Sequence, residues 1–346
     1  MTPDTAALVE LISKWPRKVL TQAIDQGAGD AAEIDAWIKQ ARPKQSRFHR
    51  SQKQYITAPG DEVVGYFDQR FPEVLRQIPD PPLALQVRGN AALLGEDAVA
   101  IVGSRRCTRQ GGELAVRFAE ALGDAGLVVV SGLAIGIDGS AHRGVLNKGV
   151  LNKDARTVAC LGSGLSRIYP RAHETLGRQI VEQGGALVSE YATDVEARPY
   201  QFPERNRLIS GLCRGVVLIE ASQKSGALIT ARFALEQGRD VFALPGPVTS
   251  HVSQGCHRLI REGAELVTSA DQVLIALGID CAPDLKQRDL LPSQGYLLQM
   301  IDGYAKTFDE LADLTGWSGD HLLQTLTLME LDGIVRQGSD GYIAMS

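Results

Sequence analysis

Short apolar runs alternate with helical stretches through the middle of the chain, and this alternation constrains the fold more than any other feature. Most of the runs lack alternating polar positions, which is typical of strands covered on both faces. The spacers between them, such as GGELAVRFAEALGDAG, have helical periodicity. Repeated strand–helix units predict an α/β fold with a doubly wound, parallel, Rossmann-like sheet. The runs are VAIVG from Val99, LVVVSG from Leu127, TVACLG from Thr157, ALVSE from Ala186, GVVLIEA from Gly215, DVFALPG from Asp240 and AELVTS from Ala264.

Regions of different character flank this segment. Residues 1–60 contain three short helical patterns, TAALVELI, VLTQAI and AAEIDAWIKQA, followed by a basic stretch that we interpret as a solvated arm or linker. Residues 61–278 comprise the α/β domain with a lead-in segment, whose prolines predict an extended chain. Residues 279–290 are a polar linker. Residues 291–346 show three helical patterns and two strands around a Gly-Ser-Asp-Gly turn, which predicts a winged-helix domain.

Composition excludes several classes of protein. The net charge of the 346 residues is −5, so a polyanion would have to bind a local basic patch. No apolar run reaches the ~18 residues of a membrane span, and we expect no membrane association. The five cysteines include no C-x-x-C pair, and His251, Cys256 and His257 lack a fourth ligand at a suitable spacing. We therefore expect a cytoplasmic protein without a metal or another cofactor.

The loops that follow the predicted strands carry the functional signal, because ligands of parallel sheets bind beyond the carboxyl ends of the strands. Glycines in these loops permit close approach of backbone N–H groups, and helix N-termini favour anions. Arginine offers a planar fork suited to phosphate, and lysine offers a point charge. The loops supply Arg105, Arg205, Arg207 and Lys224. These side chains predict a rim that binds phosphate at several places. For Arg205 and Arg207, the alternative is ion pairing on a helix face.

No nucleotide-binding motif accounts for this rim. The chain has no G-x-x-x-x-G-K-[ST] loop, which argues against an ATPase. The dinucleotide fingerprint has only a weak echo at Gly162 and Gly164. Several separated cationic loops suit a long polyanion better than a single pyrophosphate.

Two acidic positions have alternative interpretations. Asp138 and His142 are spaced as an acid/base pair, but an aspartate at a helix start more often caps the helix. Glu220 ends a predicted strand, and a single carboxylate is a weak indication of a metal site.

Six motifs together resemble one known family. They are AIVGSR, VVVSGLAIGIDGSAHRG, VACLGSGLSRIYPRAH, FPERNRLISGL, IEASQKSGALITARFALEQGRDVFALPGPV and GCHRLIREGAELV. In this order, over residues 95–267, the chain resembles the DNA-processing protein A family, also called Smf. The resemblance implies a protein without catalytic activity that binds single-stranded DNA without sequence preference. It also implies that this protein loads a RecA-type recombinase onto the strand in natural transformation and recombination, and that it is a homodimer.

The resemblance further implies which residues bind the nucleic acid. Within this set, Phe202 or the neighbouring Tyr200 is the candidate for base stacking. Arg106, like Arg109, is also placed to point along the helix that follows it. The resemblance implies the phosphate-binding residues Gly103, Ser104, Arg105, Arg205, Asn206, Arg207, Lys224, Ser225 and Gly226, with Phe202 for stacking. The loops after the first two strands add Arg106, Gly132 and Gly136 to the predicted set.

Two further functions remain as alternatives. Nucleotide-processing phosphoribohydrolases share a related sheet but carry a PGG-x-GT loop with a catalytic glutamate nearby, whereas the corresponding region here reads KSGALITA. In the C-terminal domain, the third helix carries Asp320, Glu330 and Asp332, and no lysine or arginine lies between its start and Arg336. A protein-contact or structural role is therefore at least as well supported there as duplex binding.

Overall fold

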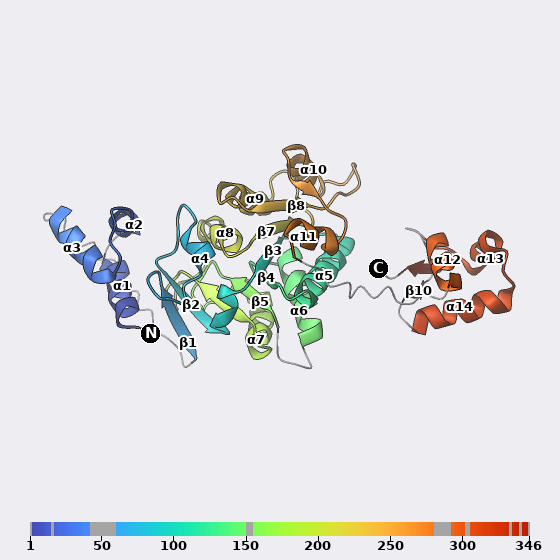
Figure 1. Ribbon diagram of the computed structural model, residues 1–346, viewed down its shortest axis with the longest axis horizontal. Coiled ribbons are helices and arrows are strands. Elements are labelled where there is room, and N and C mark those ends of the chain that lie inside the picture. The colour runs from blue at the N-terminus through green and yellow to red at the C-terminus, as the bar shows by residue number, and fades with distance from the viewer. Residues whose placement is uncertain are drawn as a thin grey trace. The chain divides into compact units, whose positions relative to one another are not determined.

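The computed structural model describes residues 2–14, 17–41, 60–149, 155–279, 292–301, 305–331, 334–338 and 341–344. The chain divides into two compact units, residues 1–280 and 281–346 (Figure 1). The basic stretch after residue 41, nearly all of the linker 279–290 and the tip of the C-terminal turn lie outside the described residues. None of the described helices combines the length and the apolar character that a membrane crossing requires.

A nine-stranded sheet, counted over the described residues, forms the centre of the first unit. Its strand order is β1-β2-β6-β5-β4-β3-β7-β8-β9. The seven predicted strands all form and pair in parallel, so the predicted fold class is confirmed. They are β3 (Ala98–Val102), β4 (Val128–Ser131), β5 (Thr157–Cys160), β6 (Ala186–Ser189), β7 (Gly215–Leu218), β8 (Asp240–Ala243) and β9 (Glu265–Leu266).

This strand order creates a topological switch point beside β3. The chain first moves outward from β3 through β4 and β5 to β6, and then returns to the other side of β3 to form β7, β8 and β9. The connections on the two sides of β3 therefore run over opposite faces of the sheet. They leave a crevice at the carboxyl ends of β3 and β7, where sheets of this kind bind ligands.

The lead-in segment is predicted only as an extended chain, whereas it forms two paired strands and a short helix. It forms β1 (Asp61–Gly65) and β2 (Ala84–Gly89), which pair antiparallel and extend the sheet beyond β6. Val63, Leu85 and Val87 are buried, so these strands contribute to the core. The prolines lie in the connection around the short helix α4 (Glu73–Arg76), where they interrupt neither strand.

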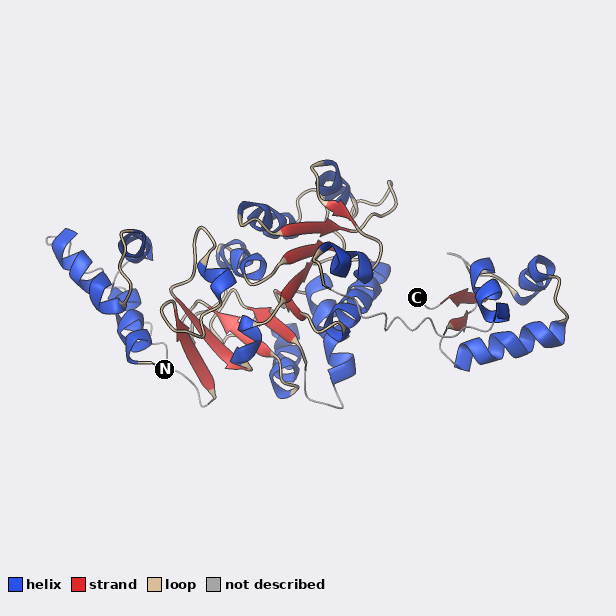
Figure 2. Ribbon diagram, viewed as in Figure 1, coloured by secondary structure: helices blue, strands red, loops and turns tan. Residues whose placement is uncertain are grey.

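Helices cover both faces of this sheet (Figure 2). Helices α5, α6 and α7 contact one another in sequence, while α4, α8 and α9 form a separate set of contacts. Thr108 begins α5 by accepting a hydrogen bond from the backbone N–H of Gly111. The helices that follow β3 in this unit are α5 (Arg109–Asp124), α6 (Ile137–Gly149), α7 (Glu174–Glu182), α8 (Gln201–Gly211), α9 (Ala227–Glu236), α10 (Gln254–Arg261) and α11 (Ala270–Ala276). Short 3-10 helices lie before β3, at Ala91–Gly95, and before α7, at Arg171–His173.

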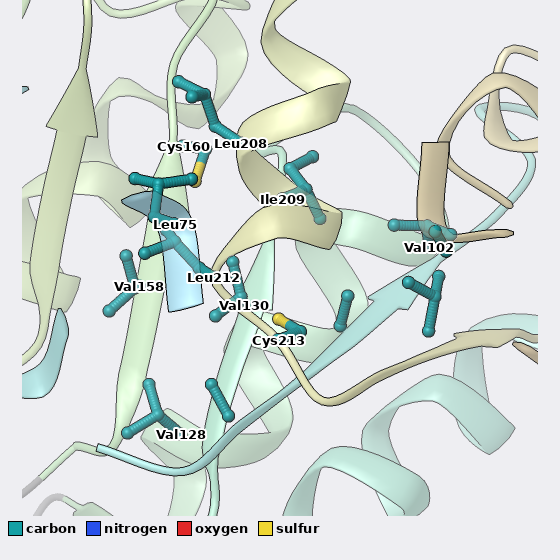
Figure 3. Close-up of a cluster of buried hydrophobic side chains, with 14 of the residues drawn as sticks. Leu75, Val102, Val128, Val130, Val158, Cys160, Leu208, Ile209, Leu212 and Cys213 are labelled. Carbon is teal, nitrogen blue, oxygen red and sulfur yellow. The ribbon is translucent and has the colours of Figure 1, made fainter. Parts of the chain in front are cut away.

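Helix α8 is anchored on the sheet by apolar side chains. Leu208 and Ile209 of this helix, and Leu212 directly after it, lie in one buried cluster with Val130 and Val158 of the strands (Figure 3). Burial of a Val, Leu or Ile side chain contributes roughly 1.5–3 kcal/mol relative to exposure. The remaining faces of α8 therefore present their side chains from a firmly held helix.

The three helices predicted in residues 1–60 are confirmed as α1 (Pro3–Lys14), α2 (Arg17–Asp25) and α3 (Ala31–Ala41). Their apolar faces meet in a small core that contains Leu8, Leu20 and Ile34. Leu83, from the start of the β2 region, belongs to the same core. These helices are thus packed onto the antiparallel edge of the sheet, within the first unit.

The second unit contains the predicted elements in the predicted order. They are α12 (Pro292–Met300), α13 (Phe308–Thr315), α14 (Gly319–Leu331) and an antiparallel hairpin of β10 (Val335–Gly338) and β11 (Gly341–Ala344). A capping box of Thr307 and Glu310 begins α13, and Gly316, with φ of 67°, ends it. Assignment of this unit to the winged-helix class stays a prediction.

Candidate functional site

A cavity of about 810 Å³ opens at the topological switch point. The loop after β3 contributes residues 103–106 to its lining, and the segment before α9 contributes Ser225 and Gly226. Helix α8 contributes Phe202, Asn206 and other side chains of one face. Segments that are more than a hundred residues apart in the sequence thus converge on one cavity, because the carboxyl ends of parallel strands lie at one edge of the sheet.

Arg105 and two aromatic rings form a contiguous group at this cavity. The guanidinium carbon of Arg105 lies 5.3 Å from the centroid of the Phe202 ring, within range of a cation–π contact. The Phe202 and Tyr169 ring centroids are 5.4 Å apart, and Tyr169 is 49% exposed. A smaller cavity of about 310 Å³ is lined by all three side chains and by Arg106. A guanidinium group that can bind phosphate and two aromatic rings on which bases can stack are therefore adjacent.

Tyr169 is missing from the predicted set. It lies in the loop GSGLSRIYPRAH after β5, a loop that the sequence did place at the same edge of the sheet. An aromatic residue directly before a proline in such a loop was the available signal. Tyr200 is exposed, and Phe202 rather than Tyr200 lines the cavity.

Arg205 is predicted as a phosphate ligand, but the structure gives it an internal role. The residue is only 3% exposed although it borders the cavity. Its Nη1 donates to the carbonyl oxygen of Gly132 at 2.8 Å and also to that of Cys160. Burial lowers the pKa of Arg205, and the negative charge of Asp138 opposes this shift. Arg205 thus ties α8 to the loop after β4 and to the end of β5.

Two predicted glycines are needed for close packing around this site. A Cβ on Gly132 would lie 2.5 Å from Nη1 of Arg205. Gly136 has φ of 87°, and a Cβ there would lie 2.3 Å from the carbonyl oxygen of Ser104. These glycines shape the loops, since larger residues would displace Arg205 or the segment that carries Arg105.

Asp138 and His142 do not form an acid/base pair facing the cavity. One carboxylate oxygen of Asp138 accepts from the N–H groups of Gly132 and Ala134, at 3.2 and 3.4 Å. Burial raises the pKa of Asp138. Nδ1 of His142 lies 2.8 Å from Oγ1 of Thr157, whose hydroxyl donates to the carbonyl oxygen of Val129. The Thr157 oxygen therefore accepts from Nδ1–H, which leaves Nε2 of His142 unprotonated and buried without a hydrogen-bond partner.

His142 predicts a specific loss of stability in acid. Burial, followed by charge interactions with His173 and Arg205, lowers its pKa from 6.5 to about 3. The unfolded chain therefore binds this proton below pH 6.5 while the folded protein does not, so the stabilising contribution falls as the pH drops from 6.5 towards 3. Between about pH 7 and about pH 5, the wild-type protein should lose about 2 kcal/mol more unfolding free energy than His142→Gln. Urea unfolding of both proteins at the two pH values measures this, and parallel losses would contradict the assignment.

Glu220 serves the loop after β3. Its carboxylate accepts from the backbone N–H of Thr108 at 2.8 Å and from Oγ1 of Thr108 at 2.6 Å. Its backbone carbonyl accepts from the N–H of Ser104 at 2.7 Å. These contacts account for the carboxylate without a metal or a catalytic role. Over the part of the chain that the structure describes, no three His, Cys, Asp or Glu side chains gather as a metal site would need.

The four cations of the predicted rim do not line one cavity, because Arg207 and Lys224 lie outside its lining. Residues two apart on a helix point to opposite sides, so Arg205 and Arg207 of α8 cannot both face the cavity. The Arg207 side chain is 5% exposed and forms ion pairs with Glu190 and Asp80. Lys224 is exposed in the loop before α9, but the lining of the cavity does not include it.

The remaining predicted residues are divided between the cavity and its surroundings. Arg106 lines both cavities. Asn206 borders the larger one, and its Nδ2 donates to the carbonyl oxygen of Gly226 at 3.3 Å. Arg109 instead points along α5, where it pairs with Glu113 at 2.9 Å.

Residues 62–278 match the protein family described as DNA recombination-mediator protein A. The chain belongs to this family. Membership in the DNA recombination-mediator protein A family confirms the predicted resemblance and gives the chain a DNA-processing, recombination-mediator role. Protein Smf of Escherichia coli K12 is 38% identical over 301 residues, which cover 84% of this chain and 79% of that protein.

Two solved structures of DNA processing protein A are similar in fold and sequence. The one from Streptococcus pneumoniae has a TM-score of 0.60 and 35% identity, and the match covers 79% of this chain and 93% of that one. The one from Helicobacter pylori has a TM-score of 0.55 and 29% identity, and covers 63% of this chain and 95% of that one. The Helicobacter pylori structure describes a single-stranded DNA binding mode of that protein.

Proposed function

We propose that this protein binds single-stranded DNA without sequence preference in the switch-point cavity and loads a RecA-type recombinase onto the strand. The observation that carries the proposal is the group of Arg105, Phe202 and Tyr169 at the cavity. The description of single-stranded DNA binding by the Helicobacter pylori relative supports it. The recombinase, a homodimeric state and a cytoplasmic location belong to the proposal, supported by the family.

The chemistry of the lining suits an unpaired strand. Arg105 and Arg106 supply positive charge for phosphates, while Ser104, Asn206 and Ser225 supply neutral hydrogen-bonding groups. Stacking of a base on an aromatic ring contributes about 1–3 kcal/mol and tolerates any base, because every base has a flat face. A duplex keeps its bases stacked on each other, so these rings favour single strands.

The proposal predicts strong salt dependence together with weak sequence dependence. The logarithm of the binding constant should fall linearly with the logarithm of salt concentration, with a slope of roughly −0.7 for each phosphate contacted. Fluorescence anisotropy with labelled oligo-dT, oligo-dA and mixed-sequence strands measures this, with a duplex of the mixed sequence as the comparison. Equal affinity for duplex and single strand would contradict the proposal, as would a preference for one sequence of more than about tenfold.

Recombinase loading is tested on the same strands. Filament formation by a RecA-type recombinase on strands already coated with a single-strand binding protein should be faster when this protein is present. An unchanged rate would remove loading from the proposal and leave strand binding.

A further inference from the structure

Helix α8 contributes Arg207 to a cluster of four charged side chains, which also contains Arg17, Asp80 and Glu190. Nη1 of Arg17, at the start of α2, lies 3.0 Å from a Glu190 oxygen, and its Nη2 lies 2.8 Å from an Asp80 oxygen. Arg207 of α8 contacts the same two carboxylates, and its Nε lies 3.2 Å from the second Asp80 oxygen. Two guanidinium groups from distant parts of the sequence therefore share two carboxylates.

The cluster joins backbone segments as well as side chains. Nη2 of Arg17 also donates to the carbonyl oxygens of Asp80 and Pro81, at 2.8 and 2.6 Å. The Glu190 side chain is 12% exposed and follows β6 directly, so it fixes the cluster to the edge of the sheet. Arg17 thereby connects the N-terminal helices to the segment before β2, to the end of β6 and, through the shared carboxylates, to α8.

Helix α8 is also the element that presents the binding residues. Arg207 faces the cluster, whereas Phe202 and Asn206 face the cavity. A second contact supports the first turn of the helix, since the Tyr191 hydroxyl, next to Glu190, donates to Glu204 at 2.9 Å. A rotation of α8 about its axis would break the ion pairs of Arg207. The same rotation would move Phe202 away from Arg105, and the cluster therefore sets the orientation of the cavity wall.

We propose that Arg17 and Glu190 are positioning residues for the bound strand, through which the N-terminal helices increase the affinity of the cavity without contacting DNA. The inference rests on the proposed function of the cavity. Loss of either residue should let α8 rotate or shift, so that Phe202 and Asn206 are no longer held in the orientation that binds the strand.

Substitutions of opposite charge distinguish positioning from simple electrostatics. If the cluster acted only through its field, Arg17→Met would weaken binding of the anionic strand and Glu190→Gln would strengthen it. Positioning predicts that both variants bind labelled oligo-dT more weakly, by roughly five- to tenfold. The salt dependence should keep its slope, because no phosphate contact is removed. Strengthened binding by Glu190→Gln, or unchanged binding by both variants, would overturn the inference.

Controls separate this inference from folding defects and from failure of the proposed function. Lys39→Met removes an ion pair within α3 that does not reach α8, and it should bind like the wild-type protein. Arg17→Lys keeps the charge but not the fork, and it should recover part of the affinity. If the wild-type protein binds oligo-dT and Arg105→Ala does not, while Arg17→Met and Glu190→Gln bind normally, the cavity assignment stands and the positioning role fails. If the wild-type protein does not bind, the proposed function itself fails.

Hydrogen exchange gives a readout that a purely structural role would not change. Coupling between two sites is reciprocal, so binding of oligo-dT at the cavity should slow amide exchange in α1, α2 and α3. Arg17→Met should abolish this added protection while the protein remains folded. Equal protection in the variant and the wild-type protein would contradict a route through Arg17.

Discussion

Replacement of Arg105 by alanine is expected to weaken the binding of single-stranded DNA by about 10- to 100-fold while the fold stays intact. A hydrogen bond to a charged group contributes roughly 1.5–3 kcal/mol, and the exposed Arg105 guanidinium is the cation that lies against the Phe202 ring. The loss should be similar for all sequences, because a phosphate contact carries no sequence information. Anisotropy titrations at fixed salt with several oligonucleotides measure both expectations.

Arg109 provides a matched control for this experiment. It lies four residues further along the same motif and is equally charged, but its side chain is 93% exposed and pairs with Glu113 on α5. Arg109→Ala should therefore change the affinity by less than about twofold, because an exposed pair contributes little. If both variants lose affinity equally, a general field rather than the Arg105–Phe202 geometry binds the strand. If neither loses affinity, the cavity is not the binding site.

Replacement of Arg205 by methionine should lower the unfolding free energy by about 3–5 kcal/mol, because each buried polar group left without a partner costs about 1–3 kcal/mol and a buried carboxylate loses a compensating charge. The substitution removes the stronger of the two positive charges, Arg205 and Arg105, that act on the buried Asp138. It also leaves the carbonyl oxygens of Gly132 and Cys160 without this donor. Chemical denaturation of the folded protein measures the loss. Asn206→Ala, the next residue of α8, should change stability far less and should weaken strand binding instead.

A double-mutant cycle separates the two parts of the Arg205 effect. Asp138→Asn in the Arg205→Met background removes the uncompensated carboxylate, so the double variant should be more stable than the sum of the single losses predicts. A different result would return Arg205 to the residues that bind the DNA strand. In that case Arg205→Met would stay within about 1 kcal/mol of wild-type stability and lose strand affinity as Arg105→Ala does.

The local pattern of residues was sufficient to predict the parallel strands and most of the helices of this fold. Apolar runs of strand length and helical spacers predicted the seven parallel strands, because each run must be covered on both faces whatever its partners are. The lead-in strands β1 and β2 escaped prediction since antiparallel pairing at a sheet edge depends on partners distant in sequence. The nearby prolines predicted extended backbone, but they gave no indication that this backbone pairs with the sheet.

The chain order of the loops also predicted which residues line the switch-point cavity together. Residues that follow parallel strands must reach the same edge of the sheet, so Ser104, Arg105, Asn206 and Ser225 were correctly expected at one place. The motif FPERNRLISGL did not indicate which of its side chains face the cavity. Arg205 and Arg207 are identical in type and two positions apart, and their roles differ only because α8 lies on the sheet by one face.

The roles of the charges were decided by three-dimensional packing. Arg205 is a buried support because the loop after β4 and the end of β5 bring carbonyl groups to it. Arg207 is an ion-pair partner because Glu190 and Asp80 lie beside it. Tyr169 reaches Phe202 only after the β5 loop folds over the sheet edge. Local sequence specifies a residue's chemistry and backbone preference, but its solvation and its partners come from segments far along the chain. Solvation and partners determine whether an arginine can bind a DNA strand or instead stabilises the fold.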